Sequence, residues 1–192
     1  MSYRMVPVPA PFSVSGGTGQ RKAGSVASLP DVFRILNEMK SDGIIDDYAI
    51  GGAMAVLFYA EPTRTYDLDV FVLLPSSEET IVVLTPIYAW LESRGFEPRA
   101  EHVIIHDVPV QLIPAYNGLV EAAITEARVH DYDDVPVRVT PPEHLVAIAF
   151  QTGGRKRRER AFQLLETADI DRDLLDGLLS RYGIEESWRG DE

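Results

Sequence analysis

YAIGGAMAVLFYAEPTRTYDLDVFVLL, residues 48–74, is the stretch that decides the fold. A short strand over 48–50 leads into the pair Gly51-Gly52, which opens a helix. Pro62 cannot continue that helix, because its ring clashes with the preceding turn and it donates no N–H. After the turn, Asp67 to Leu74 is apolar and rich in β-branched residues, which predicts a strand buried on both faces.

The polar residues of this stretch are suited to binding a metal and a phosphate. Backbone N–H groups of Gly51 and Gly52 at a helix N-terminus favour an anion. Asp67 and Asp69 are two apart on one strand, so they share a face with Cα atoms roughly 7 Å apart, and carboxylates are ligands that Mg²⁺ prefers. This arrangement favours binding of a metal-bound nucleoside triphosphate and transfer of a phosphoryl or nucleotidyl group.

The same residues also have purely structural explanations. The two aspartates can cap the strand entrance or pair with Arg64, and the glycine pair can serve only as a tight turn. Arg64 and Thr65 either contact phosphate or simply end the helix. We favour the functional interpretation of the aspartates, because two acids entering a buried strand lose hydration unless a cation meets them.

The rest of the chain is organised around this core. Residues 1–30 are rich in Pro, Gly and Ser and are predicted to be a disordered arm, 31–140 a nucleotide-binding core, and 141–192 a helical segment packed on it. Helices are predicted from Leu29 to about Ser41, from Pro75 to about Ser93, over 117–125, and over 142–151, 157–167 and 172–182. Hairpins are predicted at 101–114 and 128–140.

Composition narrows the possible functions. With 192 residues, a net charge of −12 and no cysteine, the chain has neither disulfides nor thiolate zinc sites, and the acidic balance argues against a broad nucleic-acid surface. The longest apolar run, 49–60, is about half of the ~20 residues that a membrane span needs. The N-terminal stretch lacks the apolar core of a secretory signal, so we expect a cytoplasmic protein without membrane contact.

These residues carry a family resemblance. Gly51-Gly52 followed by Asp67-Leu68-Asp69-Val70 resembles the signature of the DNA polymerase β-like nucleotidyltransferase superfamily. Around residues 110–112 and 142–145, the chain also resembles the minimal prokaryotic members of this superfamily. These members are related to abortive-infection and type IV toxin–antitoxin nucleotidyltransferases. The resemblance covers about residues 31–185 and implies an α+β fold with a mixed sheet. It also implies a Mg²⁺ (or Mn²⁺) cofactor and transfer of a nucleotidyl group from a nucleoside triphosphate to a protein, RNA or small-molecule acceptor.

One departure from the family pattern concerns catalysis. The superfamily places a third carboxylate on a later strand, and the matching position here is Gln111, whose neutral amide adds no charge and cannot act as a general base. An active enzyme would therefore use Gln111, Asp107 or Glu101 in its place, although a turn separates Asp107 from Gln111. The alternatives are a catalytically weakened nucleotide-binding protein, or an interaction component that works with a cognate protein partner.

Two further groups of residues leave their roles open. The basic cluster Arg155 to Arg160 either binds the phosphates of a nucleotide or an RNA acceptor, or is a solvated helix start that pairs with Glu159. His102 and His106 are four apart, but their surroundings are strand-like and a turn intervenes, which argues against a metal pair.

Overall fold

The computed structural model describes residues 28–60, 65, 67–75 and 84–184 of the chain. Within this part, seven strands form one mixed sheet in the order β3-β4-β5-β2-β1-β7-β6. The strands are β1 (Asp47–Ile50), β2 (Leu68–Leu73), β3 (Pro98–Arg99), β4 (His102–Ile105), β5 (Val108–Pro114), β6 (Arg128–Tyr132) and β7 (Val135–Val139). The predicted α+β class with a mixed sheet is confirmed.

Strand β2, the second half of the fold-deciding stretch, lies at the centre of the sheet. It pairs antiparallel with β1 and parallel with β5, so both of its edges are hydrogen-bonded. Leu68, Val70 and Val72 on one face are fully buried, and Phe71 on the other face is only 6% exposed, which accounts for the nearly continuous apolar run. The parallel register places Asp69 opposite Gln111, so two residues 42 positions apart in the chain become direct neighbours.

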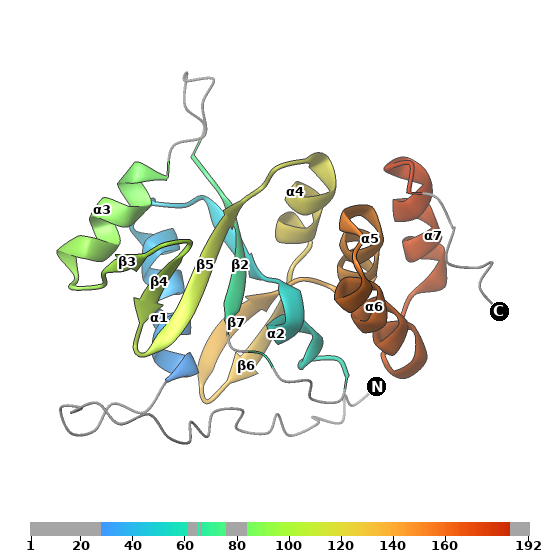
Figure 1. Ribbon diagram of the computed structural model, residues 1–192, viewed down its shortest axis with the longest axis horizontal. Helices are drawn as coiled ribbons and strands as arrows, with labels where there is room; N and C mark the ends of the chain where they lie inside the picture. The colour runs from blue at the N-terminus through green and yellow to red at the C-terminus, as the bar shows by residue number, and fades with distance from the viewer. Residues whose placement is uncertain (1–27, 61–64, 66, 76–83, 185–192) are drawn as a thin grey trace.

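Seven helices accompany the sheet in the described part of the chain. They are α1 (Leu29–Ser41), α2 (Gly52–Val56), α3 (Thr85–Ser93), α4 (Gly118–Thr125), α5 (Pro142–Thr152), α6 (Arg155–Thr167) and α7 (Arg172–Arg181). Figure 1 shows α5, α6 and α7 grouped beyond α2 and α4, on the side of the molecule away from α1 and α3. None of the helices in the described ranges is long and apolar enough to cross a membrane.

Local chemistry explains several element boundaries. The Ser28 and Asn117 side chains cap the first turns of α1 and α4. Asp133 and Asp134 join β6 to β7 with φ angles of 48° and 59°, a conformation that Asp adopts more readily than most residues.

Some predicted boundaries differ from the observed ones. The strand β3 was not predicted, because two exposed residues give no periodic signal. The α6 helix begins at Arg155, two residues before the predicted start, so the whole basic cluster is helical. Residues 1–27 of the predicted arm and the predicted helix start at 76–83 lie outside the described residues.

Two buried polar residues at the start of α5 connect it to its surroundings. Glu143 is fully buried, and its carboxylate accepts a hydrogen bond from the Arg128 guanidinium at 2.9 Å and another from the Asp171 backbone N–H at 3.0 Å. Asp171, the residue before α7, is thereby connected to the second residue of α5. Neighbouring His144 is also fully buried, and neither ring nitrogen has a hydrogen-bond partner among the described residues.

The neutral form of His144 predicts a pH-dependent stability. Burial lowers the pKa of His144, although Glu126 and Glu143 oppose the shift and Arg128 and Arg181 add to it. The unfolded chain takes up a proton below its ordinary pKa of about 6.5, whereas the folded protein resists doing so. The contribution of His144 to the free energy of unfolding should therefore be constant above about pH 7 and fall as the pH drops below about 6.5, by at most about 1.4 kcal/mol per pH unit.

Denaturant titrations between pH 5 and pH 8 measure this slope. His144→Leu should flatten it, because the variant lacks the ring that takes up a proton in the unfolded chain. The acid beside the ring is Glu126, whose Oε2 lies 3.6 Å from Nε2. The pKa of His130 is also lowered by burial, so the informative quantity is the difference between variant and wild type. An unchanged slope in His144→Leu would contradict the assignment.

Candidate active site

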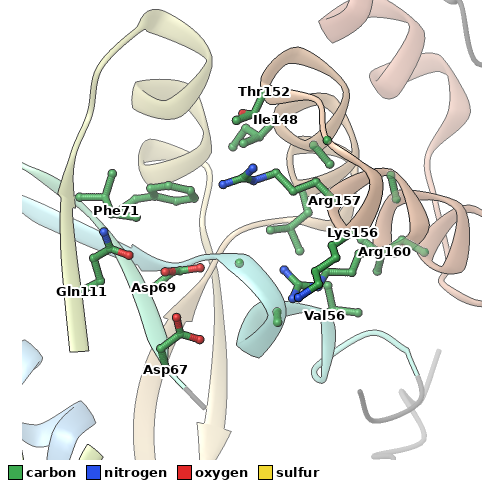
Figure 2. A pocket seen from close by; sticks show the side chains of 18 of the residues that line it. Val56, Asp67, Asp69, Phe71, Gln111, Ile148, Thr152, Lys156, Arg157 and Arg160 are labelled. Atoms are coloured by element: carbon green, nitrogen blue, oxygen red, sulfur yellow. The ribbon is translucent and has the colours of Figure 1, made fainter. Parts of the chain in front are cut away.

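A cavity of about 700 Å³ opens between the sheet and the C-terminal helices. Its sheet side carries Asp69 from β2, Asp67 from the position directly before β2, and Gln111 from β5. Helix α6 forms the opposite wall. Figure 2 shows these carboxylate and amide groups directed into the same space as the side chains of Arg157, Lys156 and Arg160. The predicted shared face of Asp67 and Asp69 is confirmed.

The glycine pair allows β2 and α2 to approach closely. Gly51 donates its N–H to the Asp69 carbonyl oxygen at 2.9 Å and caps α2. At Gly52, where φ is +55°, a Cβ atom would lie 1.9 Å from Asp69 Oδ2. Gly52 is therefore required by the position of the Asp69 carboxylate. The α2 helix is only five residues long, so the contribution of its dipole to phosphate binding is small.

The Asp69 carboxylate is held in an unfavourable environment. Burial raises its pKa, and the negative charge of Asp67 raises it further, while Arg160 and Arg157 across the cavity oppose the shift. Two carboxylates in a partly buried cavity repel each other unless a cation lies close to both. This is the electrostatic setting in which a divalent metal ion would stabilise the site.

The turn before β2 is described only in part. Arg64, the predicted phosphate ligand, lies outside the described residues. The Thr65 hydroxyl lies 3.0 Å from the Asp67 carbonyl oxygen and 3.2 Å from Asp67 Oδ1. In the structure Thr65 therefore orients Asp67, and its predicted contact with phosphate stays a prediction.

Gln111 is the partner that the structure brings to the two aspartates. It lines the cavity and lies opposite Asp69 in the sheet. Asp107 lies in the turn between β4 and β5 with a φ of 63°, and Glu101 lies in the turn between β3 and β4. Neither residue lines the cavity, so these two substitutes for a third carboxylate are not brought to the site.

The basic cluster Arg155 to Arg160 was expected either to bind phosphates or to be a solvated helix start, and its residues differ in this respect. Arg155 pairs with Glu159 at 2.8 Å and is 90% exposed, as expected of a solvated helix start. Arg155 also lines the edge of the cavity, together with Lys156, Arg157 and Arg160. The helical spacing of Arg157 and Arg160 could have indicated a shared face, but which element that face meets depends on the packing of α6 against α5 and α2.

His102 is a neighbour of the site that the sequence did not indicate. Its Nε2 lies 4.0 Å from Asp67 Oδ2, whereas His106 lies in the following turn and packs its ring against Phe96. The strand-like surroundings and the turn between the two histidines argued against a metal pair, and that expectation stays a prediction. The sequence pattern gave no sign that His102 lies near Asp67, the residue before β2.

The donor set fits a divalent cation held by Asp67 and Asp69 together with oxygen atoms of a substrate. Among the residues that the structure describes, no three His, Cys, Asp or Glu side chains already form a metal centre. Mg²⁺ commonly binds through one or two carboxylates plus substrate phosphates, so two aspartates are sufficient protein ligands for it.

Comparisons with known proteins concern the fold. The fold is that of nucleotidyltransferases: the chain is similar to the crystal structure of an antigenic nucleotidyltransferase-like protein from Paracoccidioides brasiliensis, with 15% identity, a TM-score of 0.50, and 81% of this chain and 88% of that chain covered. This agreement confirms the fold expected from the resemblance to the polymerase β-like superfamily.

Two further matches concern the antibiotic-resistance factor ANT(2'')-Ia. Its crystal structure in complex with adenylyl-2''-tobramycin matches with 15% identity and a TM-score of 0.47, covering 80% of this chain and 96% of that one. Its solution structure matches with 18% identity and a TM-score of 0.47, covering 84% and 96%. No family model and no curated protein sequence matches the chain.

Proposed function

We propose that the protein is a divalent-metal-dependent nucleotidyltransferase, which moves a nucleotidyl group from a nucleoside triphosphate to an acceptor. The observation that carries the proposal is that Asp67 and Asp69 face Arg157 and Arg160 across the same cavity. The carboxylates suit a divalent cation, and the guanidinium groups suit phosphate oxygens. A metal-bound triphosphate can contact both the carboxylates and the guanidinium groups only if it lies between the two.

The positive charge of the α6 wall, opposite the aspartates, complements the negative charge of a triphosphate. Lys156, Arg157 and Arg160 provide three positive charges, whereas the paired Arg155 is compensated by Glu159. Transfer of a nucleotidyl group requires in-line positioning and neutralisation of charge on the phosphates. The α6 wall would supply that neutralisation, and the bound metal would polarise the phosphate oxygens from the other side.

The remaining surface of the cavity suits the nucleoside. Phe71, Ile113, Leu145 and Ile148 make this part apolar, and Tyr116, which also lines it, is 55% exposed. An exposed aromatic ring can stack on a base, an interaction of about 1–3 kcal/mol per base.

Nucleotide binding and transfer are measured separately. The four nucleoside triphosphates are titrated with and without Mg²⁺ or Mn²⁺, and transfer is then followed with a nucleotide labelled at the α-phosphate. The proposal expects at least one metal-dependent binding isotherm and transfer of label to an acceptor in a lysate. Absence of binding for all four nucleotides would overturn it.

The basic wall gives a more specific prediction. Arg157→Gln and Arg160→Gln should each weaken Mg²⁺–triphosphate binding by about tenfold or more, because a hydrogen bond to a charged group contributes about 1.5–3 kcal/mol. Calorimetric titration with Mg²⁺ and ATP, and with Mg²⁺ and inorganic triphosphate, measures both losses.

Arg158→Gln is the matched control for these two variants. Arg158 belongs to the same helix but does not line the cavity, so its removal changes the net charge equally without removing a phosphate contact. Equal weakening in all three variants would show a general charge effect and would contradict direct binding by Arg157 and Arg160.

A catalytically weakened nucleotide-binding protein is the second candidate, and Gln111 is the observation that favours it. Its amide lies beside Asp69, where the superfamily places a carboxylate, so the site lacks a general base at that position. Metal-dependent nucleotide binding without transfer of label would favour this candidate. Gln111→Glu should then increase transfer, because it supplies an acid at the matching position.

The proposed cognate protein partner is tested independently of the nucleotide. Co-purification of a second protein in constant stoichiometry from the native host would support an interaction component. Purification of the chain alone, with full transfer activity, would contradict that alternative.

A further inference from the structure

The charges that line the cavity restrict the kind of acceptor that can enter it. Asp67 and Asp69 are the only acids among the described residues that line it. Four basic side chains of α6 line it as well: Arg155, Lys156, Arg157 and Arg160. In the proposed function both carboxylates bind the metal ion, so neither remains for a positively charged acceptor. An acceptor rich in amino groups would instead be repelled by the α6 wall.

The volume of the cavity leaves little room for the acceptor. About 700 Å³ is within the range of roughly 300–1,000 Å³ that is typical of a site for one small ligand. The proposed function already places the metal-bound triphosphate and its nucleoside there. The acceptor therefore extends beyond the cavity, and only its reacting hydroxyl group needs to reach the α-phosphate.

A second, more open hollow of about 390 Å³ adjoins the cavity and shares Gly154 and Arg155 with it. Its other lining residues are Arg158, Glu159 and Phe162. Arg155 pairs with Glu159 at 2.8 Å, whereas Arg158 forms no ion pair within the part of the chain that the structure describes. The hollow therefore keeps one uncompensated positive charge, beside the ring of Phe162, which is 39% exposed.

We propose, resting on the nucleotidyltransferase function above, that the acceptor is a hydroxyl compound that carries a phosphate group, and that Arg158 binds this phosphate in the second hollow. A guanidinium group can donate two parallel hydrogen bonds to phosphate oxygens. The shared edge at Gly154 and Arg155 lets the same molecule place its hydroxyl group in the cavity. A phosphomonoester of a small molecule and a phosphodiester of an oligonucleotide both have this chemistry.

The transfer step is balanced without a further reactant. The hydroxyl oxygen of the acceptor forms a bond to the α-phosphorus of the nucleoside triphosphate. The bond between that phosphorus and the oxygen leading to the β-phosphate breaks, and pyrophosphate leaves with the electron pair. The hydroxyl proton passes to water. The phosphate group in the second hollow positions the acceptor and does not itself react.

Transfer of label to a fractionated lysate tests the charge of the acceptor. A lysate of the native host is separated by ion exchange into anionic, neutral and cationic fractions. Each fraction is incubated with the full-length protein, Mg²⁺ and the α-labelled nucleoside triphosphates. We expect transfer in the anionic fraction. Its loss after treatment with phosphatase, which is removed before the reaction, would identify a phosphomonoester. Its loss after treatment with nuclease would identify an oligonucleotide.

Variants of Arg158 test the second hollow. Arg158→Gln should raise the amount of the anionic fraction needed for half-maximal transfer by about three- to tenfold, because the contact is charged but open to solvent. It should leave the affinity for Mg²⁺ with inorganic triphosphate unchanged, and Arg158→Lys should keep most of the acceptor affinity. Arg99→Gln is the matched charge control, since Arg99 is exposed on β3 and lines neither hollow.

The outcomes separate this inference from the function on which it rests. Transfer only to the neutral or cationic fraction, or transfer that survives combined phosphatase and nuclease treatment, would overturn the phosphate-bearing acceptor and leave the nucleotidyltransferase proposal standing. An unchanged half-maximal amount in Arg158→Gln, or an equal rise in Arg99→Gln, would do the same. Absence of transfer to every fraction would overturn both.

Discussion

Replacement of Asp67 and Asp69 together by Asn should abolish nucleotidyl transfer while increasing the stability of the protein. Transfer should fall by at least about a thousandfold, because a bound cation supplies several kcal/mol of charge stabilisation and about 1.4 kcal/mol corresponds to a factor of ten. Metal-dependent nucleotide affinity should be lost in the same variant. Label transfer and calorimetric titration measure the two losses.

The gain in stability has a separate cause. Burial and the Asp67 charge raise the pKa of Asp69 in the folded protein, so its ionised form is less favourable there than in the unfolded chain. Because the pKa of Asp69 is raised in the folded protein, its contribution to stability is lost as the pH rises through that pKa. At pH 7 the cost of ionising Asp69 in the folded protein is therefore present. The double Asn variant removes it, and its thermal midpoint without metal should exceed that of the wild type.

Retained metal-dependent affinity in this variant would place the nucleotide site elsewhere. Asp131→Asn with Asp134→Asn is a matched control, because it removes the same charge from the exposed β6–β7 hairpin, away from the cavity. It should leave transfer unchanged. A loss of stability in the Asp67 and Asp69 variant would mean that these carboxylates stabilise the fold.

Gly52→Ala should be the most disruptive single methyl addition in the site. The new Cβ atom would lie 1.9 Å from Asp69 Oδ2 and 2.8 Å from its Cγ, and the backbone φ of +55° is unfavourable for alanine. Left-handed backbone costs about 1–2 kcal/mol and overpacking about 1–3 kcal/mol, so we expect a loss of about 2–5 kcal/mol in the free energy of unfolding. Denaturant titration measures it.

Gly43→Ala separates the two contributions. Gly43 has a similar φ of +71°, but nothing in the described structure lies within 4 Å of an added Cβ. It should therefore show only the backbone cost of about 1–2 kcal/mol. In the double variant Gly52→Ala with Asp69→Ala, the cost attributable to Gly52 should fall toward the Gly43 value. Equal effects of Gly52→Ala and Gly43→Ala would show that Asp69 does not approach Gly52 as closely as described.

The strand–helix–strand unit and the shared face of its aspartates were predictable because they depend on local rules. Alternation along a strand placed Asp67 and Asp69 together, and the glycine pair marked the start of a helix. The structure adds why the second glycine is needed: the Asp69 carboxylate occupies the space of its missing side chain. That reason involves two elements and could not be derived from either alone.

The sequence by itself determined the class of fold and the shared strand face of Asp67 and Asp69. Periodicity, capping and helix-breaking residues act over a few residues, so they can be recognised without coordinates. Only the tertiary structure decided that Gln111 pairs with Asp69, that His102 meets Asp67, and that Arg157 and Arg160 face the aspartates across one cavity. Strand register and helix packing bring together residues that are far apart in the chain, and their contacts depend on the whole core.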